Sequence, residues 1–156
     1  MAELSISISF RAYHGTFQKR ESTFLIRVQY FGKLINGFVN NMDSVSCSKA
    51  LIRISSSFQN QDIDNIVGRA TCENIAMYFF EHLCPKPDRV SVSENNEISA
   101  CLSKDDYLEI PYDSYLFLQK GVRYMVRGEL ESAEQSFTKS IAFCNENYQA
   151  YLLRSR

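Results

Sequence analysis

The stretch FRAYHGTFQKRESTFLIRV, residues 10–28, places His14 directly after a run of alternating apolar and polar side chains. A second alternating run begins a few residues later, so the stretch predicts two strands joined by a short loop. One imidazole with no second histidine, thiol or carboxylate pair beside it is not a catalytic site. Its partners therefore lie elsewhere in the chain, or the site has been lost.

The composition predicts a globular protein rather than a disordered one. The chain has 156 residues, of which 45% are apolar and 13% aromatic, which suffices for one ordinary domain with a hydrophobic core. Its 17 basic and 18 acidic residues nearly cancel, and no block of lysine and arginine stands out. We therefore expect no nucleic acid partner.

The sequence predicts neither a signal peptide nor a membrane span. The N-terminal MAELSISISF has an early acidic residue and alternating apolarity, unlike a secretory signal. No apolar run approaches the length that crosses a bilayer. The cysteines are odd in number and never form a C-x-x-C pair, which predicts unpaired thiols in a cytoplasmic protein. They are Cys47, Cys72, Cys84, Cys101 and Cys144.

Hydrophobic periodicity predicts the order β-β-α-α-β-β for the first two thirds of the chain. Side chains alternate in four short runs and follow helical spacing in two longer ones. Asn41 or Asp43 is expected to cap the first helix and Thr71 the second, while Asn36-Gly37 marks a turn. The expected strands cover residues 4–10, 23–30, 90–92 and 98–102, the helices residues 47–58 and 72–83, and a loop residues 59–70.

The C-terminal residues 114–156 follow an acidic linker at 104–113 and have a helical pattern. They resemble a tetratricopeptide repeat, a hairpin of two antiparallel helices with small residues at the crossing and aromatic residues between the helices. Ser140 replaces that family's usual alanine, and Asn145 and Asn147 stand where a proline would close the repeat. An ordinary helical hairpin is therefore the alternative. The residues that carry the resemblance are Gly121, Tyr124, Gly128, Leu130, Ala133, Phe137 and Ile141.

Residues 3–103 resemble the family of 6-pyruvoyl-tetrahydropterin synthase and 6-carboxy-tetrahydropterin synthase. The resemblance implies that family's tunnelling fold, an α+β unit whose antiparallel sheet carries two helices on one face. We therefore expect a pterin-synthase-like domain at 1–103 and a tetratricopeptide-like segment at 114–156. The stretches that carry the resemblance are FRAYH, GFVNNMDSVS, FQNQDIDNI, RATCENIAMYFFEHL and VSVSE.

The resemblance also implies a zinc site, which three histidines hold in that family. His14 matches the histidine of the first strand, but Arg20 and Ser22 occupy the positions of the other two. A protein zinc site needs three or four ligands, and an arginine repels the cation. We therefore expect no zinc and treat these three positions as a degenerate metal site.

Two further parts of the family's machinery are replaced. The loop GTFQKRES holds no cysteine, although that family has its reactive cysteine between these strands. Gln59 and Asn60 stand where an Asp-His pair would relay protons, and neither amide titrates near neutral pH. The resemblance therefore predicts the fold without the chemistry, in a protein that is not an enzyme.

Glu94 is the one residue of the family's site that the sequence retains. It matches a glutamate that anchors the pterin ring, and a carboxylate suits the N–H and NH₂ edge of a pterin or a guanine. The alternative is a solvated residue beside the Asn95-Asn96 turn. For His14, the alternative to a metal ligand is a packed histidine at the end of a strand.

The predicted architecture leaves sheet edges and apolar helix faces that need a partner to cover them. A four-stranded sheet has open edges that invite pairing, and the resemblance implies subunits joined edge to edge as trimers that stack into hexamers. A single repeat cannot bury its apolar faces alone. Cover from the sheet domain, a neighbouring subunit or a separate protein is expected for Tyr115, Leu116, Leu118, Tyr148, Tyr151 and Leu152.

Three functions follow from these features. The first is a non-enzymatic oligomeric adaptor, in which the sheet domain assembles the particle and Tyr115, Leu118, Tyr148, Tyr151 and Leu152 bind a protein. The second is a sensor that holds a pterin-like or purine-like ligand at a subunit interface through Glu94. The third is a synthase-like lyase with a rearranged site.

Overall fold

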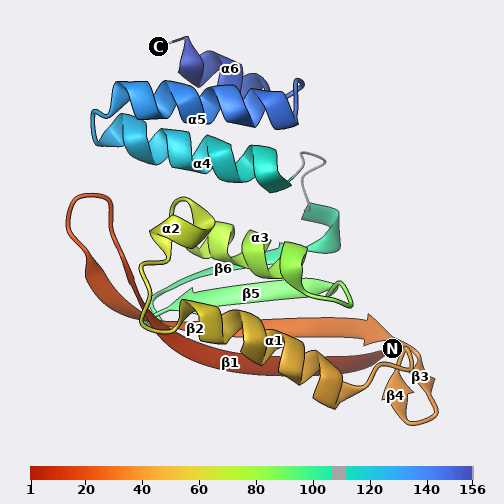
Figure 1. Ribbon diagram of the computed structural model, residues 1–156. Coiled ribbons are helices and arrows are strands. Elements are labelled where there is room, and N and C mark those ends of the chain that lie inside the picture. The colour runs from red at the N-terminus through yellow and green to blue at the C-terminus, as the bar shows by residue number, and fades with distance from the viewer. Residues whose placement is uncertain (107–111, 156) are drawn as a thin grey trace. The chain divides into compact units, whose positions relative to one another are not determined.

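The computed structural model describes residues 1–106 and 112–155 as an α+β protein with an antiparallel sheet and helices (Figure 1). Residues 107–111 of the predicted linker lie outside the described residues. The strands are β1 Ala2–His14, β2 Arg20–Gly32, β3 Leu34–Ile35, β4 Phe38–Val39, β5 Arg89–Glu94 and β6 Ile98–Ser103. The helices are α1 Ser44–Phe58, α2 Asp64–Val67, α3 Cys72–His82, the 3-10 turn Lys104–Asp106, α4 Tyr112–Val126, α5 Leu130–Phe143 and α6 Tyr148–Arg154.

The described residues form two compact units. The first contains residues 1–13, 21–62 and 71–106, and the second contains residues 14–20, 63–70 and 112–155. Within the second unit, the Arg127 Nε donates to the Thr16 carbonyl oxygen at 2.7 Å, so the turn after β1 belongs with the C-terminal helices. Domain boundaries at residues 103 and 114 stay a prediction.

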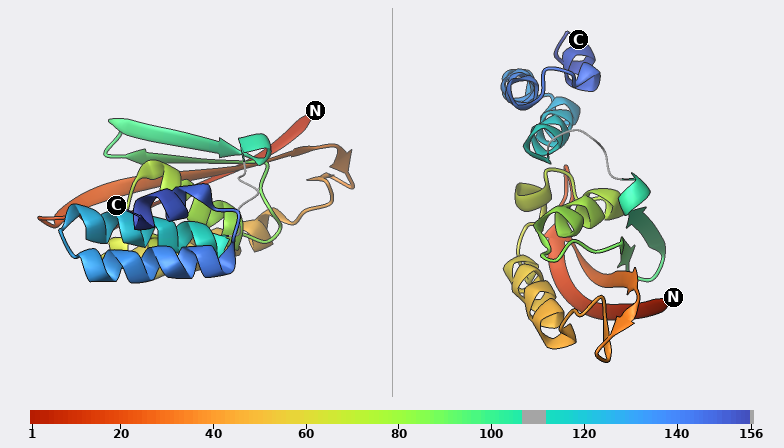
Figure 2. Two further views of the ribbon diagram at one scale, coloured as in Figure 1. Left: turned by 90° about the horizontal axis from the view of Figure 1, so that it is seen from above. Right: turned by 90° about the vertical axis from the view of Figure 1, so that its right-hand side faces the viewer.

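The first unit is built on a four-stranded sheet in the order β1-β2-β5-β6. β2 and β5 are antiparallel, with Phe24 opposite Glu94 and Val28 opposite Val90. Both α1 and α3 lie on the same face of this sheet (Figure 2). The strands begin and end beyond the predicted ranges, because the alternation continues into polar residues that carry little hydrophobic signal.

An aromatic cluster joins the sheet to its helices. The ring of Phe10 in β1 stacks on Phe24 in β2 with centroids 5.5 Å apart, and it meets Phe58 of α1 at 5.4 Å. Phe58 in turn contacts Phe79 of α3 at 5.3 Å. All four side chains are buried, and stacked or edge-on rings stabilise a core beyond the area they bury.

Local sequence signals set several boundaries as expected. Asp43, rather than Asn41, caps α1 by accepting from the Val45 and Ser46 backbone N–H groups. Thr71 caps α3 by accepting from the Asn74 N–H at 3.2 Å. The expected loop at 59–70 contains the one-turn helix α2, which is too short to show a hydrophobic period.

The open face of the sheet is polar. In β1 the serines at positions 5, 7 and 9 are exposed, while the side chains between them are half-buried. The alternation continues as Phe10, Ala12 and His14 are buried and Arg11 and Tyr13 are exposed. The same alternation that packs one face on the helices therefore leaves the serine-rich face to solvent.

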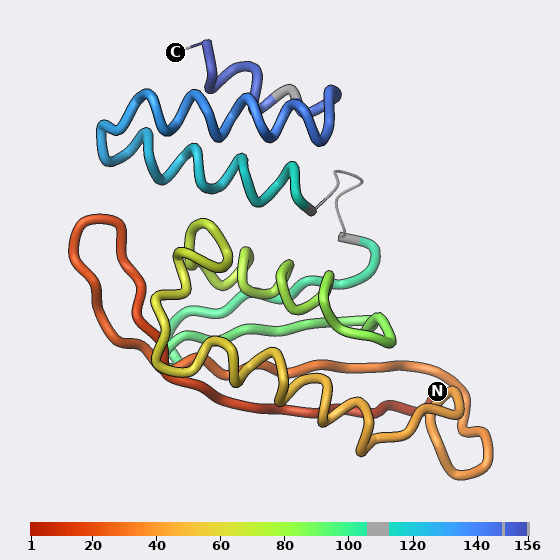
Figure 3. The backbone as a smooth tube through the Cα atoms, viewed as in Figure 1, coloured from red at the N-terminus to blue at the C-terminus, as the bar shows by residue number. Residues whose placement is uncertain are grey.

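The helices α4 and α5 run antiparallel, joined by a short turn in which Gly128 has a positive φ of 79° (Figure 3). Gly121 faces Phe137 across the pair, and a Cβ on Gly121 would overlap the aromatic ring. Phe137 packs in one core with Leu118, Ala133 and Ala150, so α6 belongs to the same cluster. A helical hairpin is thus present, and its identity as a tetratricopeptide repeat stays a prediction.

A buried polar network connects the three C-terminal helices. Ser114 and Ser140 each donate a hydroxyl hydrogen bond to the other's backbone carbonyl oxygen, at 2.7 and 2.6 Å. The Asn147 amide donates to both hydroxyls at 3.0 Å. The serine and asparagine that depart from the repeat pattern therefore compensate one another, because each satisfies polar groups that burial would otherwise strand.

Replacing Gly121 with alanine should destabilise the helical hairpin. In an exposed helix this change stabilises by about 1 kcal/mol, but here overpacking against Phe137 should outweigh it and cost about 1–3 kcal/mol. Chemical denaturation followed by circular dichroism measures the difference. Glu131→Ala, at an exposed position of α5, is the control and should change stability by less than about 0.5 kcal/mol. An unchanged Gly121→Ala protein would show that the helices do not cross this closely.

Candidate functional site

Polar side chains occupy the ends of three strands. β1 ends at His14, β2 begins at Arg20, and β5 ends at Glu94. Because alternate residues of a strand share a face, Ser22 lies on the same side as Phe24 and Ile26. His14, Ser22 and Glu94 are accordingly buried, whereas Arg20, the first residue of its strand, is exposed.

Ser22 and Glu94 form a buried hydrogen bond. The Ser22 hydroxyl donates to a Glu94 carboxylate oxygen at 2.8 Å, and Glu94 is only 7% exposed. Burying a carboxylate is costly unless its oxygens accept hydrogen bonds, which this hydroxyl helps to provide. The alternative of a solvated turn residue is therefore wrong for Glu94, since the turn is formed by Asn95 and Asn96 with positive φ angles.

Asn95 holds this corner of the sheet in place. Its side-chain oxygen accepts from the Thr23 N–H at 2.9 Å, and its own backbone N–H donates to the Thr23 carbonyl at 2.8 Å. The Asn95 amide also donates to the Ser22 hydroxyl at 3.4 Å. The Ser22 hydroxyl is thus engaged on both sides, as donor to Glu94 and as acceptor from Asn95.

Cys72 lies near the same carboxylate, and its thiol is not activated as a nucleophile. Burial raises the pKa of its thiol, and the negative charges of Glu94 and Glu73 raise it further. The thiolate is the nucleophilic form, so a thiol with a raised pKa stays protonated and unreactive at neutral pH. Cys72 therefore does not replace the cysteine that the β1–β2 loop lacks.

The three positions predicted as a degenerate metal site do not fit zinc. His14 offers one imidazole, but Ser22 contributes a neutral hydroxyl that is already bonded to Glu94, and Arg20 contributes a cation. Within residues 1–106 and 112–155, no group of three or more His, Cys, Asp or Glu side chains is placed to hold a metal ion. Together the three positions supply one ligand of a type that zinc binds, whereas a protein zinc site needs three or four.

The predicted replacements of the proton relay are surface amides. Gln59 accepts from the Arg11 N–H at 3.1 Å and donates to the Asn60 side-chain oxygen at 3.2 Å. Asn60 has a positive φ of 58°, and its N–H donates to the Arg11 carbonyl. Both residues tie the end of α1 to β1, which is a structural role.

Asp64 is a buried carboxylate that the sequence did not single out. In the second unit, one of its oxygens accepts from the Gly15 N–H at 2.8 Å and from the Lys19 ammonium at 2.9 Å, while the other accepts from the Ala70 N–H at 2.8 Å. Burial by itself would raise the pKa of Asp64, but these donors outweigh it and the net pKa is lowered. The carboxylate fastens the β1–β2 turn to residues 63–70.

The residues predicted to bind protein differ in how far their side chains are exposed. Tyr151 and Leu152 on α6 are exposed at 39% and 65%, and Tyr115 on α4 is half-buried. Leu118 is only 2% exposed and belongs to the core between the helices, so it presents no surface to a partner. The Tyr148 side chain lies outside the described part of the structure.

Comparison with known proteins supports the fold. No family model matches the chain, and no curated protein matches it. Among solved structures, the 6-pyruvoyl tetrahydropterin synthase of Caenorhabditis elegans is similar, with a TM-score of 0.58 and 15% identity. The match covers 65% of this chain and 94% of that one. At this identity the likeness shows the fold alone, and it confirms the predicted similarity to the pterin synthase fold.

The Asp64 carboxylate should make stability depend on pH. Because its pKa is lower in the folded than in the unfolded protein, its contribution is present above the ordinary carboxyl pKa of about 4 and is lost as the pH falls below it. Asp64→Asn should lower the free energy of unfolding by about 1–3 kcal/mol at pH 7 and by less near pH 3.

Denaturant titrations at both pH values measure this difference. Glu97→Gln, in the exposed turn before β6, serves as the control and should leave stability unchanged at either pH. A loss in Asp64→Asn that is equally large at pH 3 would contradict the assignment of the effect to the ionised carboxylate.

Proposed function

We propose that this protein is a non-enzymatic oligomeric adaptor. The sheet unit assembles the particle, and the C-terminal helices bind protein. The observation that carries the proposal is the Ser22–Glu94 hydrogen bond, since the hydroxyl at a degenerate zinc position is committed to a carboxylate within the fold. A partner within the chain gives the Ser22 hydroxyl a structural role, which supports a function for these positions without zinc.

Assembly follows from the edges of the sheet. β1 and β6 are the outer strands, and β6 exposes Ile98 by 57%. An exposed strand edge with an apolar side chain favours pairing with another chain. We propose homo-oligomers joined at these edges, with a trimer or a hexamer as the favoured size, as the resemblance to pterin synthases implies.

Protein binding is assigned to the C-terminal helices. Tyr151 and Leu152 are exposed apolar side chains on neighbouring positions of α6, with Tyr115 half-buried on α4. An oligomer that displays several copies of these helices would gain avidity for a multivalent target. The described helices include none long and apolar enough to span a bilayer. All five cysteines are free thiols, as suits the proposed cytoplasmic location.

The burial of Glu94 favours a second candidate, a sensor for a pterin-like or purine-like ligand. A buried carboxylate is a hydrogen-bond acceptor of the kind that suits the N–H and NH₂ edge of such a ligand. Thermal shift with pterins and guanine derivatives tests it, with Glu94→Gln as the variant. A ligand-induced shift that is equal in both proteins would remove Glu94 as the anchor.

The native mass should reveal the oligomer and its dependence on the sheet edge. Light scattering on the full chain should give a multiple of the 18.0 kDa subunit, with three or six subunits favoured. Ile98→Lys places a charge on the edge strand β6 and should shift the mass toward the monomer. Glu97→Lys, in the exposed turn before β6, should not. A wild-type monomer at all concentrations would contradict the assembly role.

A further inference from the structure

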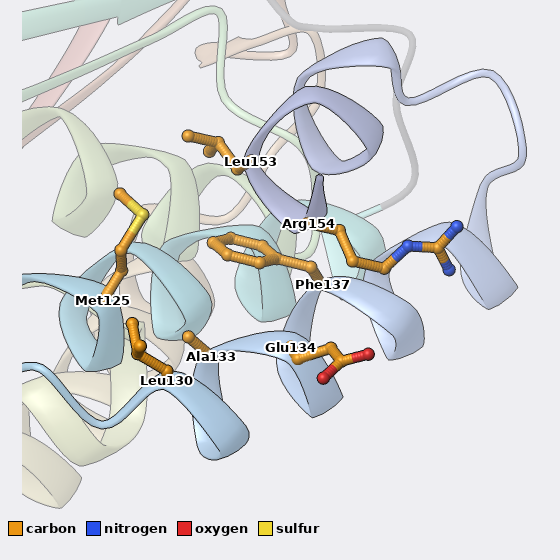
Figure 4. Close-up of a pocket in the computed structure, with 7 residues that line it drawn as sticks. All are labelled: Met125, Leu130, Ala133, Glu134, Phe137, Leu153 and Arg154. Atoms are coloured by element: carbon orange, nitrogen blue, oxygen red, sulfur yellow. The ribbon is translucent and has the colours of Figure 1, made fainter. Parts of the chain in front are cut away.

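The helices α5 and α6 line an open hollow of about 190 Å³ together with the end of α4 (Figure 4). Its surface is mainly apolar, with the buried side chains of Ala133 and Phe137 on α5 among its lining. The other lining residues are Met125, Leu130, Glu134, Leu153 and Arg154.

The size and lining suit a protein side chain better than a free small molecule. Small-molecule pockets usually measure roughly 300–1,000 Å³ and enclose most of the ligand. This hollow is smaller and open, and Leu130 on its wall is 70% exposed. A large apolar side chain that protrudes from another protein surface would fill it, and Leu130 is itself such a side chain.

The rim of the hollow carries one acid and one base. Glu134 on α5 and Arg154 on α6 are both exposed, and Figure 4 shows both side chains beside the apolar lining. Among the described residues no ion pair joins these two, and the Arg154 guanidinium lies over the Tyr151 ring at 5.5 Å. The rim of the hollow therefore presents one negative and one positive charge.

We propose that this hollow is a self-association surface and that its occupant is the α5–α6 surface of a second copy of the chain. A twofold axis between Glu134 and Arg154 places each beside its opposite on the other copy, so that two equivalent ion pairs form. Leu130 of each copy meets the apolar lining of the other. The inference rests on the proposed protein-binding role of these helices and names the partner.

The charge pattern favours a second copy over an unrelated protein. An unrelated partner would have to carry an acid and a base in the opposite order around an apolar side chain of the right size. A second copy already has all three, and a twofold arrangement uses each of them twice. Because complementary charges at an interface chiefly set specificity, reversing them is a direct test of the occupant.

The test reverses each charge in the full chain and measures mass against concentration by sedimentation equilibrium. Glu134→Arg alone sets two arginines against each other, and Arg154→Glu alone sets two glutamates against each other. Each should weaken self-association at least about tenfold, because like charges across an interface repel. An equimolar mixture of the two variants should associate like wild type, since every contact then pairs opposite charges.

The double variant Glu134→Arg/Arg154→Glu should also self-associate like wild type, which excludes misfolding as the cause of the single-variant losses. Glu131→Arg, at an exposed position of α5 that does not line the hollow, is the matched control and should have no effect. Equal association of wild type and both single variants overturns the inference, as does a mixture that associates no better than its components.

Failure of this inference is distinguishable from failure of the proposed function. Insensitivity to the charge reversals together with a mass that falls in Ile98→Lys would overturn the hollow as the contact while leaving assembly through the sheet edges intact. A wild-type monomer that binds a different protein through α5 and α6 would overturn self-association and the assembly role while leaving the protein-binding role of these helices intact. A monomer that binds no protein would remove both.

Discussion

The alternation of side chains along the strands is the constraint on which the rest of the sheet unit depends. Once Phe10 and Phe24 face the helices, every second residue of β1, β2 and β5 must share that face. The pairing of Phe24 with Glu94 then places the carboxylate beside Ser22. The core and the Ser22–Glu94 bond are therefore consequences of one register, and a slip by one residue would destroy both.

The sequence predicted the secondary-structure elements, which local patterns encode. It did not predict the side-chain contacts between residues far apart in the chain. Strand alternation, helix period and the caps at Asp43 and Thr71 act within a few residues, and they placed the elements and the α+β fold. Asp64 binds Gly15 from 49 positions away, and Ser22 binds Glu94 from 72, so no local signal announced either contact. Leu118 was expected to bind a protein, but it packs in a core whose other members lie on α5 and α6.

In the C-terminal helices, residues that differ from the repeat pattern satisfy one another's hydrogen bonds. Ser140 and Asn147 looked like defects in a repeat pattern, yet with Ser114 they form a satisfied buried network. Gly121 gives Phe137 its space, and the resulting core leaves a small apolar hollow with opposite charges on its rim. We infer that this surface and the sheet edges serve association, and that the predicted metal positions serve structure.

Zinc content tests this account most directly. The full chain should be incubated with excess zinc, desalted and analysed for metal beside a His14→Ala variant. The account predicts that both proteins retain the same trace amount, because Arg20 and Ser22 supply no ligands and Ser22 is bonded to Glu94. Zinc approaching one ion per chain in the wild type and absent from His14→Ala would contradict it and revive a synthase-like lyase with a rearranged site.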